Sequence, residues 1–294
     1  MSDDAAPADM RNVGHAHSGK RTSPPPRVVS DGALVVVHPR RRPQDALWTA
    51  VNAIARVHHV RSAQRAGRRR LRAGGGDGRT WTRVPSPTPP GQVVALFAVS
   101  AVSATDVWAV GRDLTATTGK TLVLHWDGRA WTQVSSPNPG ATDNQLLGVH
   151  MTSATDGWAV GLTTNSLAQD LTLVLHWDGA AWTQVSSPSF GLSNGGSQLT
   201  AVSALTGSDA WASGLVFTNG GGEGTLLLHW DGASWTRVAA PSPSPGGATG
   251  GSFLDGVHMT ATADVWSAGG TFFDSTGREQ TLLLHWNGKT WTRF

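Results

Sequence analysis

The sequence contains no cysteine and no tyrosine, and its only glutamates are Glu223 and Glu279. The absence of cysteine excludes disulfides, thiolate metal sites and cysteine nucleophiles. The absence of tyrosine excludes every mechanism that needs a phenol. No apolar run approaches the roughly 18 residues of a membrane-spanning helix. The start, Met1 to Asp4, is acidic and no apolar segment with a cleavage site follows it, so we expect no signal peptide.

The net charge of +3 averages two unlike parts of the chain. Residues 1–76 hold 14 Lys and Arg against 5 Asp and Glu, a net charge of +9, whereas residues 77–294 hold 9 against 15, a net charge of −6. We expect 1–76 to be a disordered Arg- and Pro-rich segment with one candidate helix at 45–66. This basic amphipathic pattern is typical of polyanion or membrane-surface binding. Because no aromatic residue is interleaved among the arginines of residues 61–72 for base stacking, we expect only nonspecific nucleic-acid contact.

A tandem repeat of about 50 residues fills the chain from residue 77 onward. A tryptophan recurs at spacings of 50, 51, 53 and 56 residues, at Trp81, Trp131, Trp182, Trp235 and Trp291. A second string, Ser103 to Gly111, recurs at 153–161 and more loosely at 207–214 and 262–269. A period of this length with about four short strands is typical of propeller blades rather than of helical solenoids.

Each repeat is predicted to contain four strands. An apolar strand such as Leu147–Met151 ends in a Ser-Ala-Thr-Asp turn, whose Asp can bond the backbone downstream. The strand Val107–Val110 follows in the equivalent repeat and is expected to stop at a glycine. In Leu122–Trp126 the residues that point to either face of the strand are apolar, except for the histidine. This suits a sheet that is covered on both faces. An Asp-Gly hairpin then leads into Trp131–Val134.

The residues of this pattern resemble the kelch-like repeat of galactose oxidase-type β-propellers. The matching features are the strand that ends at Gly111, the apolar strand with Trp126, the strand that begins at Trp131 and the loop with Pro137. The resemblance covers about residues 77–294 and implies an all-β propeller of four-stranded antiparallel blades. One glycine stands in place of the usual pair, and His-Trp in place of Tyr-Asp. Galactose oxidase needs a cysteine-linked tyrosine, so its copper chemistry is not implied and no cofactor is expected.

The repeat begins in the middle of a hairpin. Counting from Trp81, the chain supplies one orphan strand and then four full blades, the last of which closes at Phe294. The positions that would match Leu-His-Trp before the orphan strand are Gly74, Gly75 and Gly76. Since an open blade exposes apolar surface and unpaired edges, a ring needs its first and last blades to meet. We expect an incomplete ring rather than a closed ring of four blades, and self-association through the open blades would follow.

Residues that recur in every repeat are expected to serve the blade, whereas a single site must break the symmetry. Accordingly, we interpret the recurring histidine, first found at His125, as a structural residue, and the recurring aspartate, first found at Asp106, as a turn cap. On the inner strands one position alternates between serine and histidine, and these residues are expected to line the channel: Ser100, His150, Ser203 and His258. Two histidines without a carboxylate make a weak metal site, so we expect no bound metal.

The loops that vary between repeats share one face of the propeller, where binding residues are expected. Their polar and aromatic members are the candidate ligand-binding residues: Asp143, Asn144, Asp170, Asn219, Glu223, Phe272, Asp274, Arg278 and Glu279. Glycine, serine, threonine and asparagine dominate these loops, which favours contact with carbohydrate or peptide.

These observations predict a non-catalytic binding or scaffolding propeller that contacts a glycan, peptide or protein through the loop face. Sialidase-type propellers use a tyrosine nucleophile, which this chain lacks, so we expect no catalysis of that kind. Two alternatives stay open. One is a carboxylate-dependent glycan hydrolase or lyase, and the other is a truncated propeller fragment with no independent activity. Similar propellers are often extracellular, but the sequence does not fix a compartment.

Overall fold

The computed structural model describes residues 84–87, 93–114, 117–218, 222–243, 250–273 and 278–294. The predicted segment 1–76, its helix at 45–66 and the orphan strand at Trp81 lie outside these residues. Residues 80–294 form one compact unit. No helix in the described part of the chain is long and apolar enough to cross a membrane.

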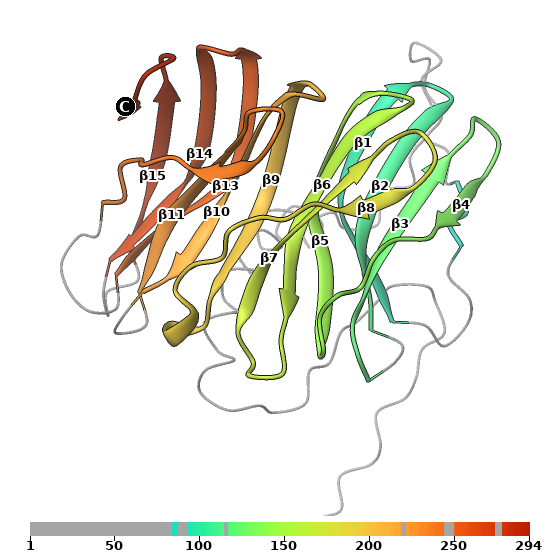
Figure 1. The fold of residues 1–294 in the computed structure, drawn as a ribbon, viewed down its shortest axis with the longest axis horizontal. Coiled ribbons are helices and arrows are strands. Elements are labelled where there is room, and N and C mark those ends of the chain that lie inside the picture. The colour runs from blue at the N-terminus through green and yellow to red at the C-terminus, as the bar shows by residue number, and fades with distance from the viewer. Residues whose placement is uncertain (1–83, 88–92, 115–116, 219–221, 244–249, 274–277) are drawn as a thin grey trace, which may run out of the picture. The chain divides into compact units, whose positions relative to one another are not determined.

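The described strands form four separate antiparallel sheets, each hydrogen-bonded in sequence order, as Figure 1 shows. Blade 1 contains β1 (Val94–Ser103), β2 (Asp106–Asp113), β3 (Lys120–Trp126) and β4 (Trp131–Val134). Blade 2 contains β5 (Asp143–Ser153), β6 (Asp156–Thr164), β7 (Asp170–Trp177) and β8 (Trp182–Gln184). A single 3₁₀ turn, η1 (Leu192–Asn194), precedes blade 3, which contains β9 (Ser197–Thr206), β10 (Asp209–Phe217), β11 (Glu223–Trp230) and β12 (Trp235–Arg237). Blade 4 contains β13 (Gly251–Ala261), β14 (Asp264–Phe273), β15 (Arg278–Trp286) and β16 (Trp291–Arg293). The predicted all-β architecture of four-stranded propeller blades is confirmed.

The glycine expected to stop the second strand of each blade instead lies inside it. In blade 2, β6 continues past Gly161 because this residue pairs with Leu146 beside a bulge in β5. A Cβ at Gly161 would lie 2.0 Å from the carbonyl oxygen of Gln145, so only glycine fits. The same close approach recurs at Gly111, Gly214 and Gly269. The glycine therefore permits the bulge of the inner strand and does not end its own strand.

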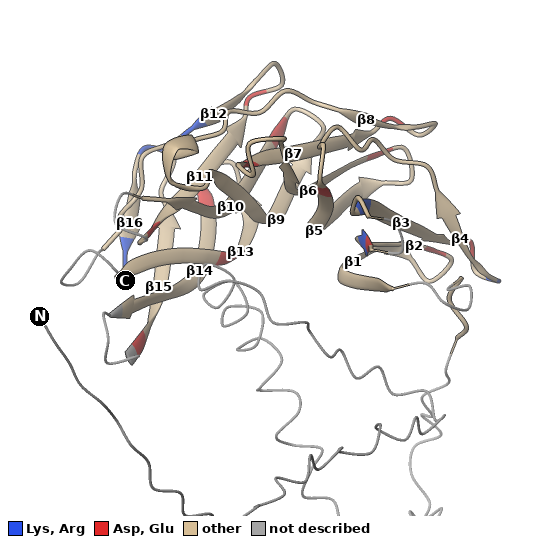
Figure 2. Ribbon diagram, turned by 90° about the horizontal axis from the view of Figure 1, so that it is seen from below, with Lys and Arg blue, Asp and Glu red and all other residues tan. Residues whose placement is uncertain are grey.

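Neighbouring blades pack face to face in chain order, so the central strands are buried on both sides. Figure 2 shows the four sheets side by side in that order. At each junction a tryptophan from the second strand of one blade inserts between two tryptophans of the next. Trp158 of blade 2, which is 1% exposed, lies 5.1 Å from Trp230 and 5.2 Å from Trp235, ring centre to ring centre. This arrangement explains why a tryptophan recurs at three positions per repeat.

The two outer blades of the series expose several apolar side chains that are buried in the inner blades. Blades 1 and 4 are not among the described sheets that pack on one another. On β1, Leu96 is 45% exposed, whereas its counterpart Leu146 in blade 2 is fully buried. On β14, Trp266 is 38% exposed, whereas its counterpart Trp158 is 1% exposed. The described blades therefore agree with the expectation of an incomplete ring.

Candidate functional site

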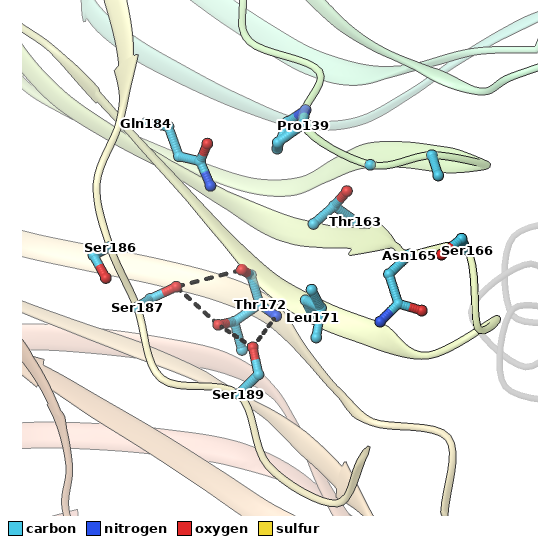
Figure 3. A pocket seen from close by; sticks show the side chains of 12 residues that line it. Pro139, Thr163, Asn165, Ser166, Leu171, Thr172, Gln184, Ser186, Ser187 and Ser189 are labelled. Carbon is cyan, nitrogen blue, oxygen red and sulfur yellow. Dashed lines mark hydrogen bonds between the residues drawn. The ribbon is translucent and has the colours of Figure 1, made fainter. Parts of the chain in front are cut away.

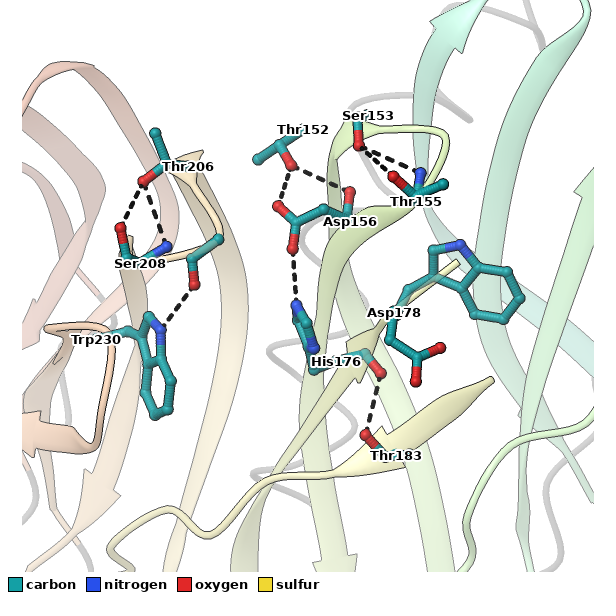
Figure 4. A network of polar contacts seen from close by, with 12 residues as sticks. Thr152, Ser153, Thr155, Asp156, His176, Asp178, Thr183, Thr206, Ser208 and Trp230 are labelled. Atoms are coloured by element: carbon teal, nitrogen blue, oxygen red, sulfur yellow. Dashed lines mark hydrogen bonds and ion pairs between the residues drawn. The ribbon is translucent and has the colours of Figure 1, made fainter. Parts of the chain in front are cut away.

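A histidine–aspartate pair recurs in every blade. In blade 2 the Nε2 atom of His176 lies 2.7 Å from Oδ1 of Asp156, and Thr152 also donates to this carboxylate (Figure 4). The His176 ring packs 4.4 Å from the ring of Trp158. The equivalent Nε2–Oδ1 distances are 2.9, 3.0 and 2.7 Å for His125–Asp106, His229–Asp209 and His285–Asp264. Because all four blades share the pair, it belongs to the blade framework and not to a single site.

The alternating inner-strand residues have two different environments. The hydroxyl oxygens of Ser100 and Ser203 accept hydrogen bonds from the backbone N–H groups of Met151 and Met259, at 3.0 and 3.1 Å. They therefore link neighbouring inner strands. Burial lowers the pKa of His150, and the positive charge of His258 lowers it further. Among the described residues, no group of three or more histidines and carboxylates could hold a metal ion. A channel-lining role for the four residues stays a prediction.

A cavity of about 380 Å³ opens among the variable loops of blade 2, as Figure 3 shows. Three segments of the chain line it, namely the loop after β4, the β6–β7 hairpin and the loop after β8. The lining residues are Pro139, Gly140, Ala141, Thr163, Asn165, Ser166, Leu171, Thr172, Gln184, Ser186, Ser187 and Ser189. Hydroxyl and amide groups dominate this wall, and no charged side chain is among them.

Part of this polar wall is a repeated structural feature. The Ser189 hydroxyl accepts from the backbone N–H of Thr172 at 3.0 Å, and the hydroxyls of Thr172 and Ser187 lie 2.8 Å apart. Blade 1 uses Asn138 in the same way against Thr121, at 2.6 Å. Three exposed side chains join this feature at the cavity. The side chains of Ser166, Gln184 and Ser186 line the cavity and bond to no other described residue.

None of the predicted ligand-binding residues lines this cavity, but three of them border it. Asn144 is fully buried, and its side-chain oxygen accepts from the backbone N–H of Gly140 at 2.7 Å and from Thr163 at 2.9 Å. Asn144 thus holds two lining residues in place. Asp143 and Asp170 are both paired with Thr164, one from each side, so they lie in one row across three strands.

The carboxylates of this row have unusual electrostatics. The pKa of Asp170 is raised to about 6, because burial and the negative charge of Asp143 outweigh the hydrogen bond from Thr164, which lowers it. Burial also raises the pKa of Asp143, while the positive charge of Arg112, 4.0 Å away, opposes that shift. Two carboxyls with different environments thus lie in one row of the sheet, and neither of them lines the cavity.

The remaining candidates that the structure describes lie in blades 3 and 4 and do not line this cavity. Burial raises the pKa of Glu223 to about 7, with a smaller contribution from the charge of Asp255, and its Oε2 atom has no hydrogen-bond partner among the described residues. Desolvation and the charge of Glu279 raise the pKa of Asp255 in turn. The ring of Phe272 lies 6.0 Å from that of Phe253. Asn219 and Asp274 lie outside the described residues, as does the side chain of Arg278.

Most of the cavity residues could not be identified from the sequence. Gln184 and Ser186 have counterparts of the same type in blade 1, and the lining residues come from loops about 20–50 positions apart. Asp255 was also absent from the predicted set, although the other blades carry Phe97, Leu147 and Thr200 at its position. That break in the repeat is the signal that could have identified it.

Comparisons with known proteins bear on the fold. No protein-family model matches the chain, and no curated protein matches it. A solved structure of a protein of unknown function from Dyadobacter fermentans is similar with a TM-score of 0.51 at 13% identity, over 71% of this chain and 70% of that one. Weaker similarities are to the GH74 xyloglucanase from Xanthomonas campestris, at a TM-score of 0.36 and 13% identity over 67% of this chain and 38% of that one, and to the SapL1 lectin in complex with alpha methyl fucoside, at 0.35 and 13% over 68% and 78%. At these identities the similarity concerns the fold alone, which is that of a β-propeller.

Proposed function

We propose that this chain is a carbohydrate-binding propeller that holds a small glycan in the cavity of blade 2. The observation that carries the proposal is the lining of that cavity. Its volume of about 380 Å³ falls within the range of about 300–1,000 Å³ that is usual for small-ligand sites. Sugar hydroxyls donate and accept hydrogen bonds, and hydroxyl and amide side chains can do both in return.

The side chains without a partner supply the specific contacts. Gln184 offers one acceptor and two donors, and Ser166 and Ser186 each offer a hydroxyl. Pro139 and Leu171 add apolar surface on which the C–H groups of a sugar ring can pack. The lining contains no charged group, so a neutral saccharide is favoured over an anionic one. A peptide or protein bound through the same loop face is the broader form of the proposal.

The test is a binding screen of the full chain against neutral mono- and disaccharides, followed by calorimetric titration of any saccharide that binds. We expect Gln184→Ala and Ser186→Ala each to weaken binding by about tenfold, the effect of losing about one hydrogen bond. The matched control is Gln133→Ala, since Gln133 holds the same register position in blade 1 as Gln184 holds in blade 2. Equal losses for Gln133→Ala and Gln184→Ala, or no saccharide bound, would contradict the proposal.

A second candidate function is glycan hydrolysis or elimination at the same cavity. It is favoured by the row formed by Asp143 and Asp170, in which Asp170 has a pKa of about 6 and can hold a proton near neutral pH. In that case Asp170 would act as the acid and Asp143 as the base. Asp170→Asn would then abolish turnover of a bound saccharide and leave its affinity within a few-fold, whereas binding without any turnover by the unaltered chain would exclude this candidate.

The finer assignment of the blades to the kelch-like, galactose oxidase-type group is also part of the proposal. It is supported by the strand order of each blade, the glycine of the second strand and the tryptophan that begins the fourth. The proposed function does not depend on that group's catalytic chemistry, because the residues that such chemistry needs are absent from the sequence.

A further inference from the structure

The cavity of blade 2 has a counterpart beside blade 3, because the repeat places equivalent positions there. Arg237 in β12 holds the position that Gln184 holds in β8, since each follows the tryptophan and threonine that begin its strand. Phe190 holds the position of Pro139, since each lies two residues after the proline of a Ser-Ser-Pro sequence. Pro139 and Gln184 both line the cavity of blade 2, as Figure 3 shows. Phe190 and Arg237 are therefore the residues that belong to the counterpart.

The hydrogen bond that fixes the wall of the cavity also recurs in blade 3. The Ser242 hydroxyl accepts from the backbone N–H of Thr225 at 3.0 Å, as the Ser189 hydroxyl accepts from that of Thr172 in blade 2. The loop after β12 is thus held against its blade by the same contact as the loop after β8. The differences between the cavity and its counterpart therefore depend on the side chains.

Two large side chains are in contact at the counterpart. The guanidinium carbon of Arg237 lies 4.8 Å from the ring centre of Phe190, which is a cation–π contact. The ring is partly buried and packs against the core between blades 2 and 3, so its position is held from below. A sugar ring has no room between a guanidinium and an aromatic ring at this distance. In blade 2 the equivalent residues, Pro139 and Gln184, instead border an open space of about 380 Å³.

The other positions of the wall differ in their chemistry. Ser186 and Ser187 of the cavity correspond to Ala239 and Ala240 in the loop after β12. The position of Thr163 is taken by a valine in β10. Three hydroxyl groups that line the cavity are thus missing from the counterpart, which offers fewer hydrogen-bonding partners to a neutral saccharide. Packing and polarity both act against saccharide binding beside blade 3.

We propose that the stacked side chains of Phe190 and Arg237 close the blade 3 counterpart, so that only one of these two positions holds a saccharide. This inference rests on the proposed function, because it takes the blade 2 cavity as the open copy of the site. The two stacked positions thus determine which copies are open. Proline and glutamine leave the space accessible, whereas phenylalanine and arginine fill it.

The first test opens the counterpart in the full chain. Phe190→Ala and Arg237→Gln together remove the stacked pair, and Ala239→Ser returns one hydroxyl to the wall. Calorimetric titrations use methyl glucoside, methyl galactoside, methyl mannoside, cellobiose and lactose as neutral probes. For a probe that the unaltered chain binds, we expect the number of sites per chain to rise by one in the triple variant. Ala239→Ser alone is the matched control, since it retains the stacked pair, and its number of sites is expected to stay unchanged.

The second test closes the cavity of blade 2. Pro139→Phe with Gln184→Arg introduces the stacked pair there, and we expect no binding of the same probe. Pro139→Ala with Gln184→Ala removes the same two side chains but leaves the space open, so binding is expected to weaken by about tenfold and remain measurable. This control separates closure of the cavity from loss of its contacts.

The outcomes distinguish this inference from the proposed function. A triple variant that melts cooperatively and has the same number of sites as the unaltered chain would overturn the inference and leave the proposed function intact. If the triple variant does not fold, the second test decides, and equal binding by its two double variants overturns the inference. An unaltered chain that binds none of the probes contradicts the proposed function, and the inference fails with it.

Discussion

The imidazole of His176 lies 2.7 Å from the carboxylate of Asp156, and this contact ties strand β7 to the turn between β5 and β6. The pair lies under the buried ring of Trp158, which packs 4.4 Å from the imidazole. The carboxylate also lies close to Gly207 in the next blade, where an added Cβ would be 3.0 Å from Oδ1. One polar pair thus connects the third strand, the turn and the neighbouring blade.

Loss of this pair is expected to destabilise the fold. Asp156→Ala removes the acceptor of His176 and leaves a half-buried imidazole without its partner, which should lower the free energy of unfolding by about 1–3 kcal/mol in urea titrations. The control is Asp264→Ala in blade 4, where the same bond involves an aspartate side chain that is 46% exposed rather than 22%. A smaller loss is expected there, and equal losses would show that burial does not determine the strength of the pair.

Tryptophans at one repeat position are expected to differ in their contribution to stability. Trp158→Ala removes a ring that is 1% exposed and should cost about 3–5 kcal/mol. Trp266→Ala removes the equivalent ring of blade 4, which is 38% exposed, and should cost roughly half as much or less. Both are measured by denaturant unfolding at low protein concentration. A loss for Trp266→Ala as large as that for Trp158→Ala would mean that the blade 4 face is covered in solution.

The fold could be predicted from the sequence because every repeat contains the same arrangement of strand and turn residues. The hairpin Asp127-Gly128, the apolar β3 and the fourth strand at Trp131 were all placed correctly. The length of the first strand was not, because the bulge at Leu146 to Gly148 breaks the two-residue alternation on which the prediction relied. The equivalent bulge in blade 1 also explains why the strand predicted to end at Gly111 continues past it. The pairing of His176 with Asp156 was also missed, since the two were interpreted separately.

The site could be predicted only in part, for a physical reason. The cavity lies among loops of the variable face, but it is lined by residues such as Gln184 and Thr172, whose types recur in other blades. A rule that selects only residues that break the repeat cannot find a pocket built from common residues at one junction of loops. It does select Asp143 and Asp170, whose raised pKa values follow from burial that no single sequence reveals.

The buried carboxyl of Glu223 is expected to make stability depend on pH. Its folded pKa of about 7 lies above the ordinary value of 4.5, so the folded state holds a proton that the unfolded state loses first. The stability of the chain should therefore fall, through this group, as pH rises from about 4.5 to about 7 and stay low above it. Glu223→Gln removes the charge, so it should stabilise the chain by on the order of 1–3 kcal/mol at pH 8 and by almost nothing at pH 4. Thermal melts at both pH values test this, and a gain of equal size at pH 4 would contradict it.

The bulge glycines and an unconstrained glycine in the same type of sheet should respond in opposite ways to an added methyl group. Gly161→Ala places a Cβ 2.0 Å from the Gln145 carbonyl oxygen, so β5 or β6 must shift, and a loss of several kcal/mol is expected. Gly256→Ala meets no atom within 4 Å and has no positive φ, so it should be neutral or stabilise by up to about 1 kcal/mol through the unfolded state. Ala98 and Ala201 already occupy the equivalent position in blades 1 and 3, which supports that expectation. Urea titration of both variants checks it. If Gly161→Ala were tolerated as well as Gly256→Ala, the bulge would have to be able to relax without cost, and the repeated glycine would need a different explanation.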